Sequence, residues 1–186
     1  MATIREGDKT ALLIVDMQVG VVEGAWQEAL IIMNVRRAVE KARAEGIPVI
    51  WIQHTNREMP PGSPAWQIVP GLSPLPDEIR IDKHFNSSFE ETTLEETLAQ
   101  LGITHIVLAG AMTNWCIQST AYAALERGYD LTLIGDAHTT EDIDLDDGEI
   151  IKASDIIQEF NTVTNWVRYP GRTNRVVNVN ELEFTS

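Results

Sequence analysis

Four stretches of consecutive apolar residues are separated by segments in which apolar positions recur with a helical period. Apolar runs without polar alternation are typical of strands that are buried on both faces of a sheet. We therefore predict buried strands at residues 11–15, 47–52, 106–109 and 131–134. The short run 79–82 and the segment 175–179 add two further strands, the second of them at an edge.

The segments between these runs predict helices. Between the first two runs, Ile31, Val35 and Val39 share one face, and Gly46 is a typical helix stop. Two capping-box spacings, Thr92 with Glu95 and Thr93 with Glu96, predict the start of the next helix.

Two more helices are predicted at residues 114–127 and 150–166. Alternating strands and helices with buried strands imply right-handed crossovers and a mostly parallel sheet. We therefore expect one domain, residues 1–186, with a three-layer α/β/α Rossmann-like fold and six strands.

Two segments do not fit a regular element. Residues 54–79 hold six prolines and two glycines, so we expect an ordered functional loop near the site. Residues 141–155 are acidic but lack the ligand pattern of a calcium loop, so we expect a solvated face.

Composition and charge exclude several classes of protein. Of the 186 residues, 44% are hydrophobic and 23% charged, as in ordinary globular chains. Lys and Arg total 14 against 28 Asp and Glu, a net charge of −14 that repels nucleic acid and anionic membranes. No secretory signal or membrane-spanning run is visible, so we expect a cytoplasmic protein.

Three side chains that can do chemistry follow predicted strands. Asp16 follows the first run, Lys83 follows residues 79–82, and Cys116 opens a predicted helix after the 106–109 strand. Ligands bind at the carboxyl ends of strands in such sheets. A helix start and a nearby ammonium both lower a thiol pKa, so we expect an accessible thiolate. Taken singly, each residue is better explained without catalysis: Cys116 as a buried apolar side chain, Asp16 as a helix cap and Lys83 as a solvated lysine.

The sequence motifs around the three residues favour a catalytic interpretation. Asp16-Met17-Gln18, Lys83-His84-Phe85-Asn86-Ser87-Ser88-Phe89 and Gly110-Ala111-Met112-Thr113-Asn114-Trp115-Cys116-Ile117 occur in the order found in isochorismatase-like cysteine hydrolases. The chain closely resembles this family over roughly residues 11–140.

The resemblance implies a catalytic triad of Asp16, Lys83 and Cys116 that hydrolyses small molecules without an organic cofactor. It also implies a cis peptide between Ala111 and Met112, an oxyanion hole formed by the backbone N–H groups of Met112 and Cys116, and a homodimer or homotetramer. Because the cysteine is retained, we expect cleavage of a C–N bond in a carboxamide, carbamoyl or ureido substrate through a thioester.

Two alternatives remain open at this stage. One is an isochorismatase-type vinyl-ether hydrolase, in which Asp16 is the acid and Cys116 is incidental. The other is a non-catalytic module that binds a small molecule or a partner, although the chain has neither a Gly-x-Gly-x-x-Gly motif after its first strand nor a Walker motif.

The metal and substrate contacts are predicted as follows. Nicotinamidases of the family hold a metal with Asp-x-His and a later His, but this chain has Gln53-His54 there, so we expect no metal. Four residues near the motifs are candidates for substrate binding, although the two asparagines are also natural loop and cap residues: Gln18, Asn86, Asn114 and Trp115.

Overall fold

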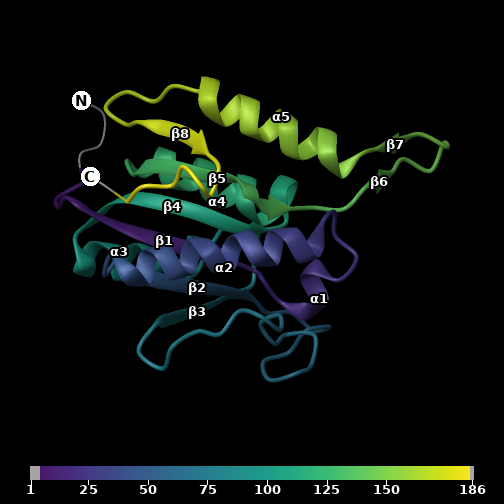
Figure 1. Ribbon diagram of the computed structural model, residues 1–186, viewed down its shortest axis with the longest axis horizontal. Coiled ribbons are helices and arrows are strands. Elements are labelled where there is room, and N and C mark those ends of the chain that lie inside the picture. The colour runs from purple at the N-terminus through teal and green to yellow at the C-terminus, as the bar shows by residue number, and fades with distance from the viewer. Residues whose placement is uncertain (1–4, 185–186) are drawn as a thin grey trace.

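Strands and helices alternate along most of the chain in a computed structural model, which describes residues 5–184 (Figure 1). The strands are β1 (Lys9–Val15), β2 (Val49–His54), β3 (Ile79–Lys83), β4 (Ile103–Ala111), β5 (Asp130–Thr139), β6 (Ile143–Asp144), β7 (Ile150–Ile151) and β8 (Asn174–Val177). The helices are α1 (Val19–Val22), α2 (Glu28–Ala44), α3 (Leu94–Leu101), α4 (Gln118–Glu126) and α5 (Ala153–Trp166), with a π-helical turn η1 (Thr113–Ile117) before α4.

Six strands form one parallel sheet in the order β3-β2-β1-β4-β5-β8. The predicted fold, a six-stranded parallel sheet flanked by helices, is therefore confirmed. The chain builds outward from β1 to β2 and β3, and then crosses to β4 on the other side of β1. Such a reversal of strand order opens a crevice at the carboxyl ends of the two central strands.

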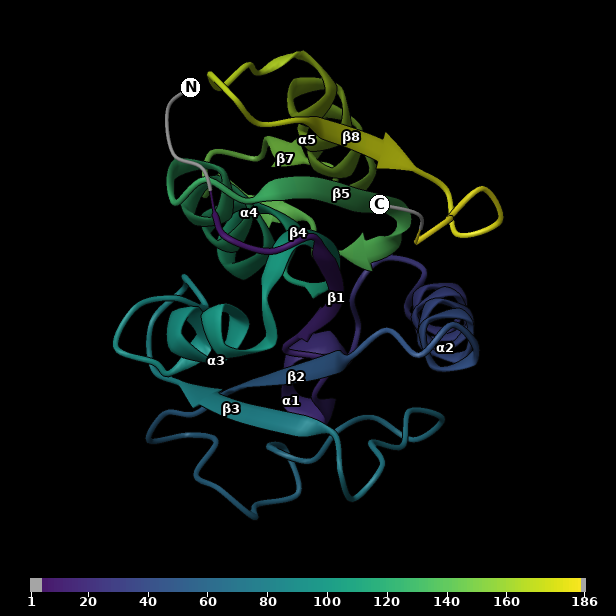
Figure 2. The same cartoon turned by 90° about the vertical axis from the view of Figure 1, so that its left-hand side faces the viewer.

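Each face of the sheet has its own apolar core, and Figure 2 shows α3 and α4 on one side of the sheet and α2 on the other. On one face α3, α4 and α5 contribute Leu98, Ala124 and Phe160. On the other face α2 packs together with the C-terminal residues Leu182 and Phe184. Burial on both faces explains why the central strands have uninterrupted apolar sequences.

Two details of the predicted helices are wrong. The predicted capping boxes do not form: Thr93, the residue before α3, makes no side-chain cap bond. The Thr92 hydroxyl accepts from the N–H of Leu94, the first residue of α3, and donates to the carbonyl of Ser88. The closing helix begins at Ala153 rather than at residue 150, because Ile150 and Ile151 pair with β6 in an antiparallel hairpin. This hairpin, β6–β7, projects from the body in Figure 1.

The proline-rich segment is ordered by contacts with the chain that follows β1. The N–H groups of Val19 and Gly20 donate to carbonyls of Gln67 and Ala65, and that of Val69 donates to the carbonyl of Met17. Residues 55–78 therefore lie beside the carboxyl end of β1. Between residues 5 and 184, no helix is long and apolar enough to cross a membrane.

Candidate active site

Asp16 lies in the crevice between β1 and β4. Its backbone turns into the left-handed region with a φ of 52°, which Asp tolerates better than most residues. Its N–H donates to the carbonyl of Ile52 at 2.9 Å, which holds it against the end of β2. On the β4 side, a Cβ at Gly110 would lie 2.0 Å from the carbonyl oxygen of Val15. Only glycine allows the two strand ends to approach this closely.

Lys83 is the last residue of β3, and its side chain is completely buried. Its Nζ lies 2.7 Å from Asp16 Oδ2 and donates to Cys116 Sγ at 3.2 Å and to the Phe85 carbonyl at 3.1 Å. A buried ammonium is stable only when its N–H groups are paired. The structure thus brings Asp16, Lys83 and Cys116 together, with the ammonium group between the carboxylate and the thiol.

Cys116 lies in the π-helical turn η1 rather than in the first turn of a regular α-helix. The N–H of Ile117 donates to the carbonyl of Met112, five residues earlier, at 3.1 Å. Short π-helical segments are often found at functional sites. The turn sets Cys116 beneath the end of β4, and only 9% of its surface is exposed.

The expectation of an accessible thiolate is wrong. Burial, followed by the neighbouring Asp16 carboxylate, raises the pKa of Cys116 to about 12, although Lys83 opposes this shift. Burial also raises the pKa of Asp16, against the opposing effect of Lys83. The lowering of the thiol pKa by a helix start and one ammonium group is therefore smaller than its raising by burial and the Asp16 carboxylate. The resting site therefore holds Cys116 as a thiol.

Gln18 supports the proline-rich segment. Its Nε2 donates to the carbonyls of His54 and Trp66, each at 3.0 Å, and its Oε1 accepts from the N–H of His54 at 2.7 Å. The side chain is fully buried. These bonds occupy the amide group, so Gln18 positions the loop, whereas the sequence suggested a contact with the substrate.

The end of β2 does not fit the metal set of nicotinamidases. Gln53 directs its amide to the carbonyl of Trp66 at 3.0 Å, and Nδ1 of His54 lies 3.4 Å from Lys83 Nζ. Burial and the Lys83 charge lower the pKa of His54. In the described part of the chain, no three His, Cys, Asp or Glu side chains are grouped as metal ligands.

The other predicted features are a cis peptide bond and three side chains that differ in their hydrogen bonds and exposure. The peptide bond between Ala111 and Met112 is cis, as the resemblance implies. Asn114 accepts a hydrogen bond from the Thr140 hydroxyl at 2.6 Å, which fixes its side chain. Trp115 is 55% exposed, and Asn86 is also exposed. The substrate contacts of Asn86 and Trp115 therefore stay predictions.

A buried histidine network also reaches the site, and the sequence analysis missed it. Nδ1 of His138 lies 2.8 Å from the hydroxyl of Thr113, the first residue of η1, and its Nε2 lies 2.9 Å from Oδ1 of Asn161. Asn161 in turn donates to the carbonyl of Gly135. Its Oδ1 must therefore accept from Nε2–H, and Thr113 donates to Nδ1. Burial lowers the pKa of His138 to about 4, so the ring is neutral.

The network joins β5 to the segment that carries Cys116. A shift in strand register after Leu108 pairs Gly110 with His138, which brings His138 to the catalytic end of the sheet. No sequence signal links Thr113, His138 and Asn161, because they are far apart along the chain.

The parallel sheet places a thiol, an ammonium group and a carboxylate together where its strand order reverses. This arrangement is typical of a cysteine hydrolase. The isochorismatase domain family matches residues 10–167. The chain therefore belongs to the isochorismatase-like hydrolase family.

Individual relatives support the same assignment. Streptothricin hydrolase of Streptomyces noursei is 31% identical over 72% of this chain and 55% of its own length. Ureidoacrylate amidohydrolase of Methylobacterium radiotolerans is 32% identical over 58% of this chain and 54% of its own length. The chain thus spans about half the length of these two curated relatives.

Two solved structures match almost the whole chain. An isochorismatase from Pseudomonas putida KT2440 has a TM-score of 0.84 and 30% identity, covering 97% of this chain and 94% of its own. N-carbamoylsarcosine amidase from Thermoplasma acidophilum has a TM-score of 0.75 and 25% identity, covering 95% and 99%.

Proposed function

We propose that this protein hydrolyses a C–N bond of a small carboxamide, carbamoyl or ureido substrate through a thioester on Cys116. The observation that carries the proposal is the position of the Lys83 ammonium, which contacts both Asp16 and Cys116 inside a buried site. Such a group stabilises a negative charge on either partner. A proton can therefore move from the thiol to the carboxylate while the Lys83 ammonium still balances the remaining negative charge.

The first step is attack by sulfur. Asp16 accepts the thiol proton as Cys116 Sγ forms a bond to the substrate carbonyl carbon, and the carbonyl π electrons move to its oxygen. The site keeps one negative charge beside Lys83 until that charge passes to the oxyanion. Because the pKa of the free thiol is raised to about 12, proton removal accompanies the attack and does not precede it.

The second step expels the nitrogen. The backbone N–H groups of Met112 and Cys116 are the donors that we assign to the oxyanion, since preorganised donors stabilise charge as it develops. Protonated Asp16 gives its proton to the leaving nitrogen as the C–N bond breaks and the carbonyl reforms. Ammonia or an amine leaves, and Cys116 carries the acyl group as a thioester.

The last step releases the acid. Asp16, again a carboxylate, takes a proton from water as the water oxygen attacks the thioester carbonyl. The C–S bond then breaks, and the proton on Asp16 returns to the sulfur. Asp16 thus serves as base and acid twice, while Lys83 holds it in position.

Relatives support this choice among the family's reactions. Two of them are named for C–N hydrolysis, a ureidoacrylate amidohydrolase and an N-carbamoylsarcosine amidase. In a vinyl-ether hydrolase the cysteine is incidental, whereas here Lys83 donates directly to the thiol. That contact favours a nucleophilic role for Cys116.

We also propose that the chain binds a small-molecule substrate and forms a homodimer or homotetramer. The projecting β6–β7 hairpin exposes three aliphatic side chains, Leu145, Ile150 and Ile151. Exposed apolar groups on a projecting element favour association. Light scattering after gel filtration distinguishes these assemblies from a monomer.

The reaction is tested with a panel of amides, ureas, ureido acids and vinyl ethers. We expect ammonia or amine release from at least one nitrogen compound, and none from the same compound with the Cys116→Ala variant. Pyruvate release from a vinyl ether that survives the Cys116→Ala substitution would overturn the proposal in favour of the alternative.

A further inference from the structure

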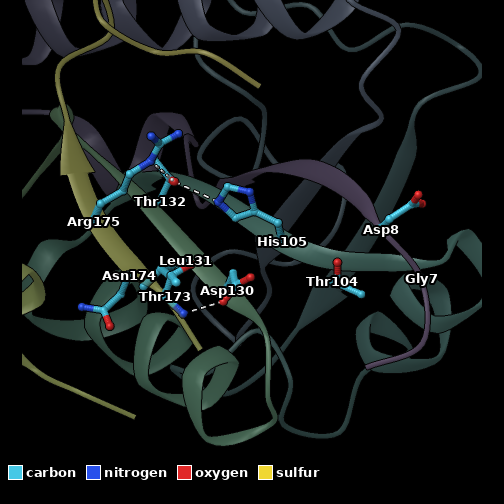
Figure 3. A pocket seen from close by; sticks show the side chains of 10 residues that line it. All are labelled: Gly7, Asp8, Thr104, His105, Asp130, Leu131, Thr132, Thr173, Asn174 and Arg175. Carbon is cyan, nitrogen blue, oxygen red and sulfur yellow. Dashed lines mark hydrogen bonds between the residues drawn. The ribbon is translucent and has the colours of Figure 1, made fainter. Parts of the chain in front are cut away.

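A second cavity opens at the amino ends of the strands, at the edge of the sheet opposite Asp16 (Figure 3). It has a volume of about 460 Å³ and lies over the starts of β4, β5 and β8, beside the chain that leads into β1. Five polar residues that line it carry the argument: Asp8, His105, Asp130, Thr132 and Arg175. The reaction proposed above uses none of them.

Arg175 forms a positive pole whose orientation is fixed. Its Nε donates to the hydroxyl oxygen of Thr132 at 3.1 Å, and its Nη2 donates to the carbonyl of Glu183 at 3.4 Å. Thr132 is fully buried and also lies 2.8 Å from Nε2 of His105. No ion pair joins Arg175 to a carboxylate within residues 5–184, although the chain has 28 acidic residues. The guanidinium group is thus held in place without a carboxylate partner.

Two carboxylates line the same cavity, and the one with a fixed side chain, Asp130, forms its negative pole. Asp130 accepts a hydrogen bond from the N–H of Thr173 through Oδ1, which fixes its side chain, and Asp8 is exposed at the rim. Neither makes an ion pair in the described part of the chain. Burial lowers the pKa of His105, Asp130 opposes that shift and Arg175 reinforces it, so both poles act on the same ring.

A cavity with two fixed poles of opposite sign selects its ligand by charge. A simple anion that reaches Arg175 meets the field of Asp130, and a simple cation that reaches Asp130 meets that of Arg175. A molecule with a carboxylate and an ammonium group satisfies both poles at once. We propose that this cavity binds a small zwitterion of the amino-acid class, with its carboxylate on Arg175 and its ammonium group on Asp130.

The test uses the isotope-labelled full chain in amide-shift titrations, and its outcome does not depend on the catalytic proposal. The probes are glycine, β-alanine and 4-aminobutyrate, which separate the two charges by increasing lengths. Propionate and propylamine, each with one charge, are the controls. We expect saturable shifts at the amides of Thr104, His105 and Thr173 with at least one zwitterion. Each single-charge control should bind at least about tenfold more weakly.

Two variants test whether Arg175 and Asp130 bind the two charged groups of the zwitterion. Arg175→Gln and Asp130→Asn should each weaken the zwitterion by about tenfold or more, since each removes a charge-assisted contact. Asp130→Asn keeps an oxygen acceptor for Thr173. Arg36→Gln, which changes an exposed arginine of α2, should leave the affinity unchanged.

Four results would overturn the proposal. They are the absence of saturable shifts across the millimolar range, equal binding of propionate or propylamine, unchanged affinity in Arg175→Gln, and shifts confined to residues around Cys116. In the last case the zwitterion would occupy the proposed catalytic site instead.

Discussion

Two lysine–aspartate pairs of nearly identical geometry lie in opposite environments. Lys83 and Asp16 are 2.7 Å apart with their side chains completely or almost completely buried, while Lys152 and Asp142, beside the projecting hairpin, are 2.8 Å apart and largely exposed. In water the second pair is solvated and screened. In the crevice the first pair has no solvent to replace a lost partner. The same contact is therefore a surface detail in one place, and in the other it belongs to the site where we propose proton transfer.

The pKa shifts of the two aspartates have opposite directions. The hydrogen bond from Lys152 lowers the pKa of Asp142, because that carboxylate stays hydrated and gains a partner. Burial raises the pKa of Asp16 in spite of Lys83. A group that must accept a proton during catalysis gains from such a raised pKa.

The largest difference is expected when the lysine is removed. Lys83→Met leaves Asp16 buried without its ammonium partner, and we expect a loss of roughly 3–5 kcal/mol in the free energy of unfolding together with loss of activity. Lys152→Met should leave the midpoint of thermal unfolding unchanged. Calorimetry of the two variants measures the contrast, and equal unfolding midpoints would contradict it.

The next largest effect is expected from Asp16→Asn, where two readouts should move in opposite directions. We expect kcat/KM to fall by about 10²–10⁴-fold, because the base is lost. The pKa of Cys116 should fall from its value of about 12, since the ammonium of Lys83 remains while the carboxylate is gone. Iodoacetamide should therefore alkylate the variant faster than the native protein at neutral pH.

Asp142→Asn is the matched control and should change neither rate. Nearly full activity in Asp16→Asn would move the general base elsewhere. Unchanged or slower alkylation would show that the carboxylate does not raise the thiol pKa.

The pH profile should show the raised pKa of Asp16 directly. The reactive form has Asp16 ionised, so activity falls as pH falls through the pKa of Asp16, by about tenfold per pH unit below it. Because burial raises this pKa above the ordinary 3.8, the acid limb of kcat/KM should lie at a higher pH than for a free carboxyl. An acid limb at or below 3.8 would contradict the assignment.

A smaller loss of stability and activity is expected when the uncharged hydrogen-bond network of Thr113, His138 and Asn161 is broken. Thr113→Val removes the hydroxyl that donates to His138 while keeping the volume, and we expect a loss of about 1–3 kcal/mol in stability. We also expect a fall in kcat with little change in KM, because η1 positions Cys116. Stability lost without any change in kcat would limit the network to a structural role.

The sequence predicts the centre of the sheet better than its periphery. The four apolar runs lie within β1, β2, β4 and β5 or extend only two residues beyond them, because burial on both faces leaves an unambiguous pattern. The hairpin was missed, since Ile150 and Ile151 are apolar but exposed and so continue the helical pattern of α5.

The site shows a similar limit. Position after a strand indicated Asp16, Lys83 and Cys116, but their grouping came from the family resemblance, because spacing along the chain does not give strand order. The thiol pKa was predicted in the wrong direction, since burial and the Asp16 contact are tertiary properties. His138 was missed for the same reason: Thr113 and Asn161 contact it only in the folded chain.

The central claim is that Cys116 becomes acylated while Asp16 transfers the proton and Lys83 holds Asp16 in position. Intact-protein mass spectrometry after rapid quenching, with the best nitrogen substrate of the panel, tests it most directly. We predict an added mass equal to the acyl part of the substrate, located on the peptide that contains Cys116, and its accumulation in turnover. Turnover of the same substrate with no adduct at Cys116, or with undiminished rate in Cys116→Ala, would contradict the account.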